Sequence, residues 1–84
     1  MKIILDQERE LEINGLTIMK YEKETGKSLF KLGDNPSMTD IIYLVWAFIK
    51  DDLPVEVVAE NINLKNMKNI SDTLGKLMSE AGNE

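Results

Sequence analysis

The sequence predicts a single α+β domain, residues 1–84, in which a short N-terminal β-hairpin packs on a bundle of about four helices. Apolar residues alternate with polar ones near the N-terminus, as they do in strands that bury one face. From residue 15 onward they recur instead at three- and four-residue spacing, which indicates helices. Because an isolated hairpin is barely stable in water, its apolar face is expected to lie on the helices.

The expected hairpin covers about residues 2–13. Residues 2–5 and 10–13 have the alternation of two short strands, and residues 6–9 suit the turn between them. We expect one face of the hairpin to belong to the core, and the side chains on that face are Ile3, Leu5, Leu11 and Ile13.

A polar cap and a glycine delimit the first expected helix. Asn14 can accept hydrogen bonds from the free amides of a helix start, and Gly26 can adopt the left-handed conformation that ends a helix. A further turn follows, and residues 33–36 are the clearest loop. Three apolar side chains of that turn are predicted to fill the end of the core: Leu29, Phe30 and Leu32.

Three further helices follow from their start signals and apolar spacing. Ser37 and Asp40 have the spacing of a capping box before a long apolar run. Pro54 suits the first turn of the next helix, and Leu64 opens the apolar stripe of the last one. The helices expected in this chain are therefore 15–25, 38–50, 54–62 and 64–81.

The apolar run IIYLVWAFI, residues 41–49, wraps the whole circumference of a helix at about 100° per residue. A bilayer span needs roughly 20 such residues, so no membrane partner is expected. One arc of the helix is ordinary core: Ile41, Ile42, Leu44, Val45, Phe48 and Ile49. The other arc is amphipathic and is predicted to contact a partner: Tyr43, Trp46, Ala47 and Lys50.

Two interpretations of this second arc stay open. Either the hairpin or the last helix covers Tyr43 and Trp46, as is usual for aromatic residues in a helical stripe, or a partner protein or a second copy of the chain covers them. If the hairpin covers Trp46, the last helix is the next place to expect a binding surface.

Composition excludes several classes of function. Ten basic and fifteen acidic residues give a formal net charge of −5, which is unsuited to a phosphate backbone and argues against nucleic acid as a partner. The chain has neither cysteine nor histidine, so disulfides and thiolate or imidazole metal ligands are excluded. The N-terminus lacks a secretory signal pattern, and a cytoplasmic protein is expected.

No motif predicts an enzyme, a cofactor or a metal site. Gly26-Lys27-Ser28 resembles the end of a phosphate-binding loop, but Tyr21 stands where the motif needs glycine. An acyl-carrier protein needs Asp-Ser-Leu at a helix start, whereas this chain has Ser71-Asp72-Thr73-Leu74. The paired carboxylates are better explained as a solvated surface than as a cation site, and we predict no catalytic, cofactor-binding or metal-binding residues.

Two segments resemble the small tail assembly chaperones of long-tailed bacteriophages. They are residues 21–29 (YEKETGKSL) and, after a Pro-Ser break, residues 38–48 (MTDIIYLVWAF). The resemblance implies a non-enzymatic protein that binds the tape-measure protein and keeps it soluble while tail tube protein polymerises around it. It also implies action in the host cytoplasm and absence from the finished virion, and in many such phages a frameshifted product recruits the tube protein.

Two other classes of function are alternatives. A small structural tail or connector subunit would persist in purified virions, where a chaperone would not. A small acidic regulator would act by binding another protein, but no sequence feature names its partner.

Overall fold

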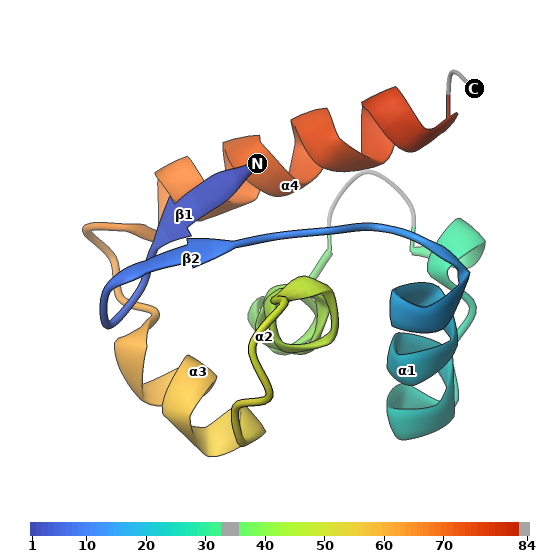
Figure 1. Ribbon diagram of the computed structural model, residues 1–84, viewed down its shortest axis with the longest axis horizontal. Helices are drawn as coiled ribbons and strands as arrows, with labels where there is room; N and C mark the ends of the chain where they lie inside the picture. Colours follow the sequence, from blue (N-terminus) through green and yellow to red (C-terminus); the bar gives the residue numbers. More distant parts are fainter. Residues whose placement is uncertain (33–35, 83–84) are drawn as a thin grey trace.

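A computed structural model of the chain describes residues 1–32 and 36–82 (Figure 1). The order of its elements confirms the predicted α+β class, with a two-stranded antiparallel hairpin followed by helices. The elements are β1 (Lys2–Ile4), β2 (Glu8–Glu10), α1 (Gly15–Thr25), the short 3₁₀ helix η1 (Leu29–Lys31), α2 (Met38–Phe48), α3 (Val55–Asn61) and α4 (Met67–Gly82).

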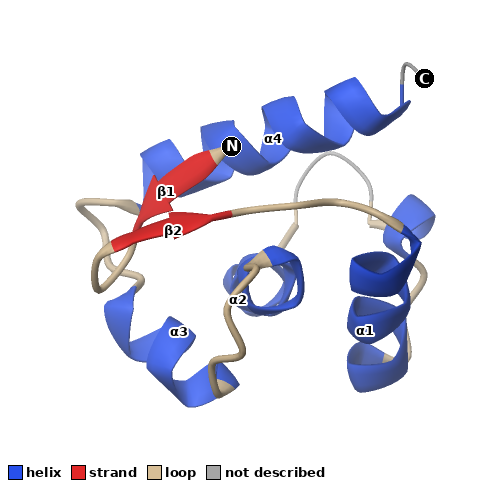
Figure 2. Cartoon of the chain, viewed as in Figure 1, coloured by secondary structure: helices blue, strands red, loops and turns tan. Residues whose placement is uncertain are grey.

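Helix α2 lies at the centre of the fold. Helices α1 and α3 lie on opposite sides of α2, and the hairpin and α4 lie together on a third side (Figure 2). Five buried side chains come from α2, more than from any other described element: Ile41, Leu44, Val45, Ala47 and Phe48. The core is therefore built around the longest apolar run of the sequence.

The predicted boundaries of α1 are confirmed by its caps. The Asn14 side-chain oxygen accepts hydrogen bonds from the backbone amides of Leu16 and Thr17, at 2.9 and 3.1 Å. The Thr17 hydroxyl oxygen accepts one from the Asn14 amide at 2.9 Å. At the other end Gly26 has a φ of 71°, a conformation that costs glycine little, and its amide bonds back to Glu22.

Helix α2 starts where predicted but ends at Phe48, two residues before the expected position 50. Ser37 and Asp40 form the predicted capping box, with both side chain-to-backbone hydrogen bonds at 3.1 Å. At the other end Ile49 is extended and forms an antiparallel bridge with Leu11. Pairing with the chain that leaves the hairpin ends α2 here, because it takes up backbone groups that the helix would use.

The second strand of the hairpin was predicted too late in the sequence. Glu8 already pairs with Ile4, so β2 is Glu8–Glu10 and not residues 10–13. The Arg9 guanidinium donates two hydrogen bonds to the Asp6 carboxylate, at 2.9 and 2.7 Å, which favours a turn shorter than residues 6–9. The predicted core face is still mostly correct, since Ile3, Leu5 and Leu11 are buried and Ile13 is partly buried.

Two apolar residues expected in the core are exposed. Phe30 is 85% exposed, whereas its neighbour Leu29 is buried, because the single turn of η1 directs consecutive side chains apart. Leu64 is 90% exposed and lies in a turn capped by the Asn63 side chain, before α4 begins at Met67. Of the predicted loop 33–36, residues 33–35 lie outside the described residues.

Tyr21 places a polar hydroxyl in the apolar core, and removing that hydroxyl measures its effect on the free energy of unfolding. Its side chain is fully buried, and its hydroxyl has no hydrogen-bond partner among the described residues. Burial, together with the nearby Asp40 carboxylate, raises the pKa of Tyr21. We expect Tyr21→Phe to raise the free energy of unfolding by about 1 kcal/mol in urea titrations, because it removes an unsatisfied polar group. Tyr43→Phe, at a partly exposed position, is the control, and a loss of stability in Tyr21→Phe would contradict the expectation.

Asp40 makes the free energy of unfolding depend on pH in the acidic range. The Ser37 amide and the Lys27 ammonium, each 3.1 Å from a carboxylate oxygen, lower the pKa of Asp40 from its ordinary 3.8. The stabilisation that ionised Asp40 contributes is therefore complete above the pKa that Asp40 has in the unfolded chain. It is lost as the pH falls through the lower pKa that Asp40 has in the folded chain. We expect Asp40→Asn to flatten the loss of stability between about pH 5 and pH 2, measured by urea unfolding. Asp52→Asn is the matched control, and an equal flattening in both variants would contradict this role.

Candidate functional site

Three side chains from two helices form what we call the aromatic patch: Lys20 of α1 with Tyr43 and Trp46 of α2. The Tyr43 and Trp46 rings pack edge to face, with centroids 6.2 Å apart and planes at 81°. The Lys20 ammonium lies over the Trp46 ring, 4.3 Å from its centroid. All three side chains are partly buried, so the patch combines apolar area with a cation and is still accessible.

The sequence places these groups together through two helical stripes. Tyr43 and Trp46 are three residues apart, so they are neighbours on α2. Lys20 lies on a side of α1 that meets α2, and α1 crosses α2 in Figure 1. Leu16 lines a cleft together with Phe48, and Lys27 donates a hydrogen bond to Asp40 at 3.1 Å. The two helices are thus held side by side at both ends of the patch.

Neither the hairpin nor α4 covers the aromatic patch. Both lie on another side of α2, where Ile41 and Leu44 line a pocket together with α4 (Figure 1). The patch lies instead next to α1, as the contact of Lys20 with Trp46 requires. Tyr43 and Trp46 are therefore only partly buried: they pack against the core next to α1 and keep part of their surface exposed.

The other two residues predicted for partner binding lie elsewhere. Ala47 is only 1% exposed and belongs to the core, so its side chain is not offered on the surface as expected. Its place on α2 turns it toward α1, which packs against it. Lys50 is exposed beyond the end of α2, and its ammonium lies 4.0 Å from the Glu12 carboxylate. Both residues line a cleft of about 280 Å³ between α1 and the end of α2.

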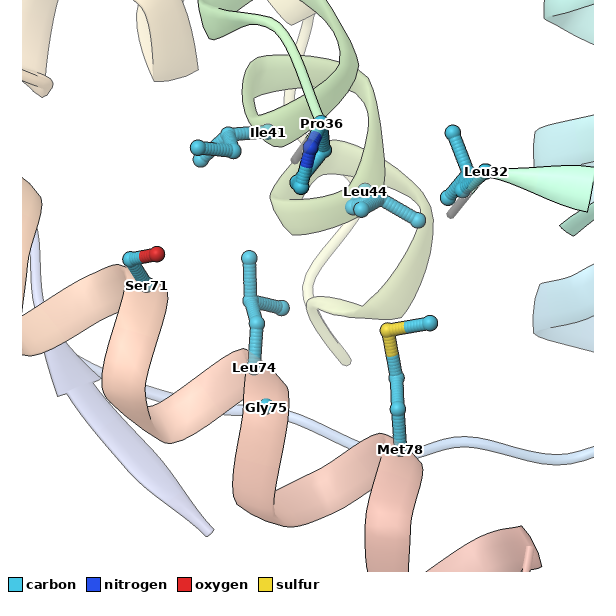
Figure 3. A pocket seen from close by; sticks show the side chains of 8 residues that line it. All are labelled: Leu32, Pro36, Ile41, Leu44, Ser71, Leu74, Gly75 and Met78. Carbon is cyan, nitrogen blue, oxygen red and sulfur yellow. The ribbon is translucent and has the colours of Figure 1, made fainter. Parts of the chain in front are cut away.

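A second apolar hollow lies between α2 and α4 (Figure 3). Its volume is about 250 Å³, and Leu74 and Met78 point into it from α4, opposite Ile41 and Leu44 of α2. Leu32 and Pro36 complete one side, on either end of a segment that the structure does not describe. The hollow has the size and lining to take one or two apolar side chains, and none of the described residues that line it is charged.

Exposed apolar side chains outside these sites were missed by the sequence reasoning. They include Leu16 and Met19 on the outer face of α1, which are 74% and 51% exposed, and Phe30 just after α1. Met19 is three residues from Leu16, a spacing that could have identified an outer stripe. The position of Lys20 over Trp46 had no sequence signal, because it depends on how two helices pack.

The described residues show no group of three or more acidic, histidine or cysteine side chains arranged to hold a metal ion. No helix in the described part of the chain is both long and apolar enough to cross a membrane. Comparisons with protein families, with curated proteins and with solved structures found no match for this chain. The case for a function therefore depends on the surface itself and on the sequence resemblance.

Replacing Lys20 by methionine tests the geometry of the patch. The variant keeps the apolar stem but removes the charge, so we expect the free energy of unfolding to fall by about 0.5 kcal/mol. Trp46 is the single tryptophan, so its fluorescence reports on the patch alone. Quenching by iodide should weaken, because a cation over the ring attracts the anion, while quenching by neutral acrylamide should hardly change. The control is Lys23→Met on the same helix, and equal iodide quenching in the two variants would argue against this contact.

Proposed function

We propose that this chain is a non-enzymatic tail assembly chaperone of a long-tailed bacteriophage. In this function it binds the tape-measure protein in the host cytoplasm, keeps it soluble while tube protein assembles around it, and leaves before the virion is complete. The observation that carries the proposal is the accessible aromatic patch on the central helix. A chaperone for an apolar client needs such a surface on an otherwise charged protein.

The segments that carry the family resemblance also build the surroundings of the patch. Residues 38–48 are helix α2, and residues 21–29 form the second half of α1 and the start of η1. Lys20, which covers Trp46, immediately precedes the second of these segments. The resemblance and the geometry therefore both favour the region around the aromatic patch as the binding surface.

The physical properties of the patch suit a helical client. Aromatic residues provide a large contact area at a small cost in conformational entropy and are common where binding energy is concentrated. An amphipathic helix can lay its apolar stripe against Tyr43 and Trp46 while its polar edges stay in water.

Co-expression with the tape-measure protein of the same phage tests the proposal. We expect the wild-type chain to raise the soluble fraction of that protein, and we expect Trp46→Ala and Tyr43→Ala to lose most of this effect because they remove the contact area. Circular dichroism and thermal unfolding of each variant establish that it is folded. Leu64→Ala removes an equally apolar but separate exposed side chain and should retain the effect.

Full client solubility with folded Trp46→Ala would contradict the role of the patch. Mass spectrometry of purified virions tests the other half of the proposal. A stoichiometric amount of this chain in the virion would indicate a structural tail or connector subunit instead of a chaperone.

A further inference from the structure

The two helices on either side of α2 differ in charge. Residues 15–31, which contain α1 and η1, carry four lysines and two glutamates, a formal net charge of +2. Residues 51–62, which contain α3, carry four acidic residues and no basic one, a formal net charge of −4. Since α1 and α3 lie on opposite sides of α2, an electrostatic field runs across the central helix (Figure 1).

Charges on both sides are available to a partner. Lys20 and Lys23 on α1 form no ion pair with any described residue. On the other side Asp51 is bound by Arg9 at 2.7 Å, but Glu56 and Glu60 are exposed and make no ion pair within the described chain. These four side chains, Lys20, Lys23, Glu56 and Glu60, can therefore bind a charged group without breaking an ion pair among the described residues.

We infer that the aromatic patch binds an amphipathic helix that carries carboxylates along its edge over α1 and lysine or arginine along its edge over α3. The inference rests on the proposed function, which makes a helix the client. An acidic edge over α1 and a basic edge over α3 each meet opposite charge, which favours this partner. If the two edges were exchanged, each would meet like charge. A second copy of the chain is disfavoured as the occupant, because two bodies of net charge −5 repel each other.

This charge arrangement sets the direction of the bound helix. Turning a helix end for end on the same face keeps its apolar stripe in contact but exchanges its two edges. A helix with one acidic and one basic edge therefore matches α1 and α3 in one direction only. The chain would thus fix not only where the client binds but also which way its backbone runs.

Two synthetic helical peptides of about 18 residues, with a shared apolar stripe and with acidic and basic edges exchanged between them, test this inference. Each carries a nitroxide at its N-terminus and is added to the isotope-labelled full chain. We expect one peptide to broaden the amide resonance of Thr39, near the start of α2, and the other to broaden that of Phe48, near its end. Broadening of the same end by both peptides would overturn the inference.

Peptides with two acidic or two basic edges are the matched controls. We expect them to bind about fivefold more weakly, because one edge then meets like charge, and equal affinity would overturn the inference. Lys23→Glu should weaken binding of the mixed-edge peptides, while Lys68→Glu, the same charge change at an exposed position of α4, should not. Equal weakening by the two variants would count against a role for the α1 side.

The outcomes separate this inference from the proposed function. If neither mixed-edge peptide binds but the chain still keeps its client soluble, the inference fails and the chaperone proposal stands. If the peptides bind with opposite directions but the client is not kept soluble, the assignment as a tape-measure chaperone fails. Concentration-dependent shifts of the patch resonances without peptide would identify a second copy as the occupant and overturn the inference.

Discussion

The apolar run of α2 can leave water only if other parts of the chain surround it, because it is apolar on every side. In a chain of 84 residues few elements are available for this task, and the three that pack on α2 are the helices α1, α3 and α4. Phe48 and Val45, both fully buried, show how completely the sides toward the hairpin, α3 and α4 are covered. The side next to α1 that bears Trp46 is covered only in part, and it is there that the chain has surface to offer a partner.

The end of α2 joins the two parts of the fold. Ile49 pairs with Leu11, and the Glu12 amide donates a hydrogen bond to the Phe48 carbonyl at 2.8 Å, so the chain leaving the hairpin is held against α2. Arg9 adds a link from the hairpin turn to Asp51, at 2.7 Å. A two-stranded hairpin is marginal alone, and these contacts, together with the packing of β1 against α4, hold it on the helices. The same contacts fix the start of the connection to α3, and with it the acidic side of the fold.

The helix starts could be predicted from the sequence because interactions within a single turn determine them. The caps at Asn14 and Ser37 satisfy amides within the same turn, so both helix starts could be predicted from spacing alone. The end of α2 could not, since it depends on the distant pairing of Ile49 with Leu11. The start of β2 was missed because the Arg9–Asp6 contact favours a shorter turn than the spacing indicated. For the candidate site, the projection of α2 placed Trp46 on the amphipathic arc but left open whether the fold covers it, and in the structure Trp46 is partly buried. The projection failed for Ala47, because its burial depends on the packing of α1.

The position of Lys20 decides how much of the Trp46 ring is open to solvent. The ammonium over Trp46 covers part of the ring, and the contact is worth only about 0.5–1 kcal/mol, so that a ligand of the patch would displace it at little cost. Because Lys20 has no carboxylate partner in the described structure, its charge can pair with an acidic client residue as the ring becomes covered. Under the proposed function, this one residue would both cover the free ring and favour an acidic group in the bound state, while the net charge of −5 opposes contact between copies.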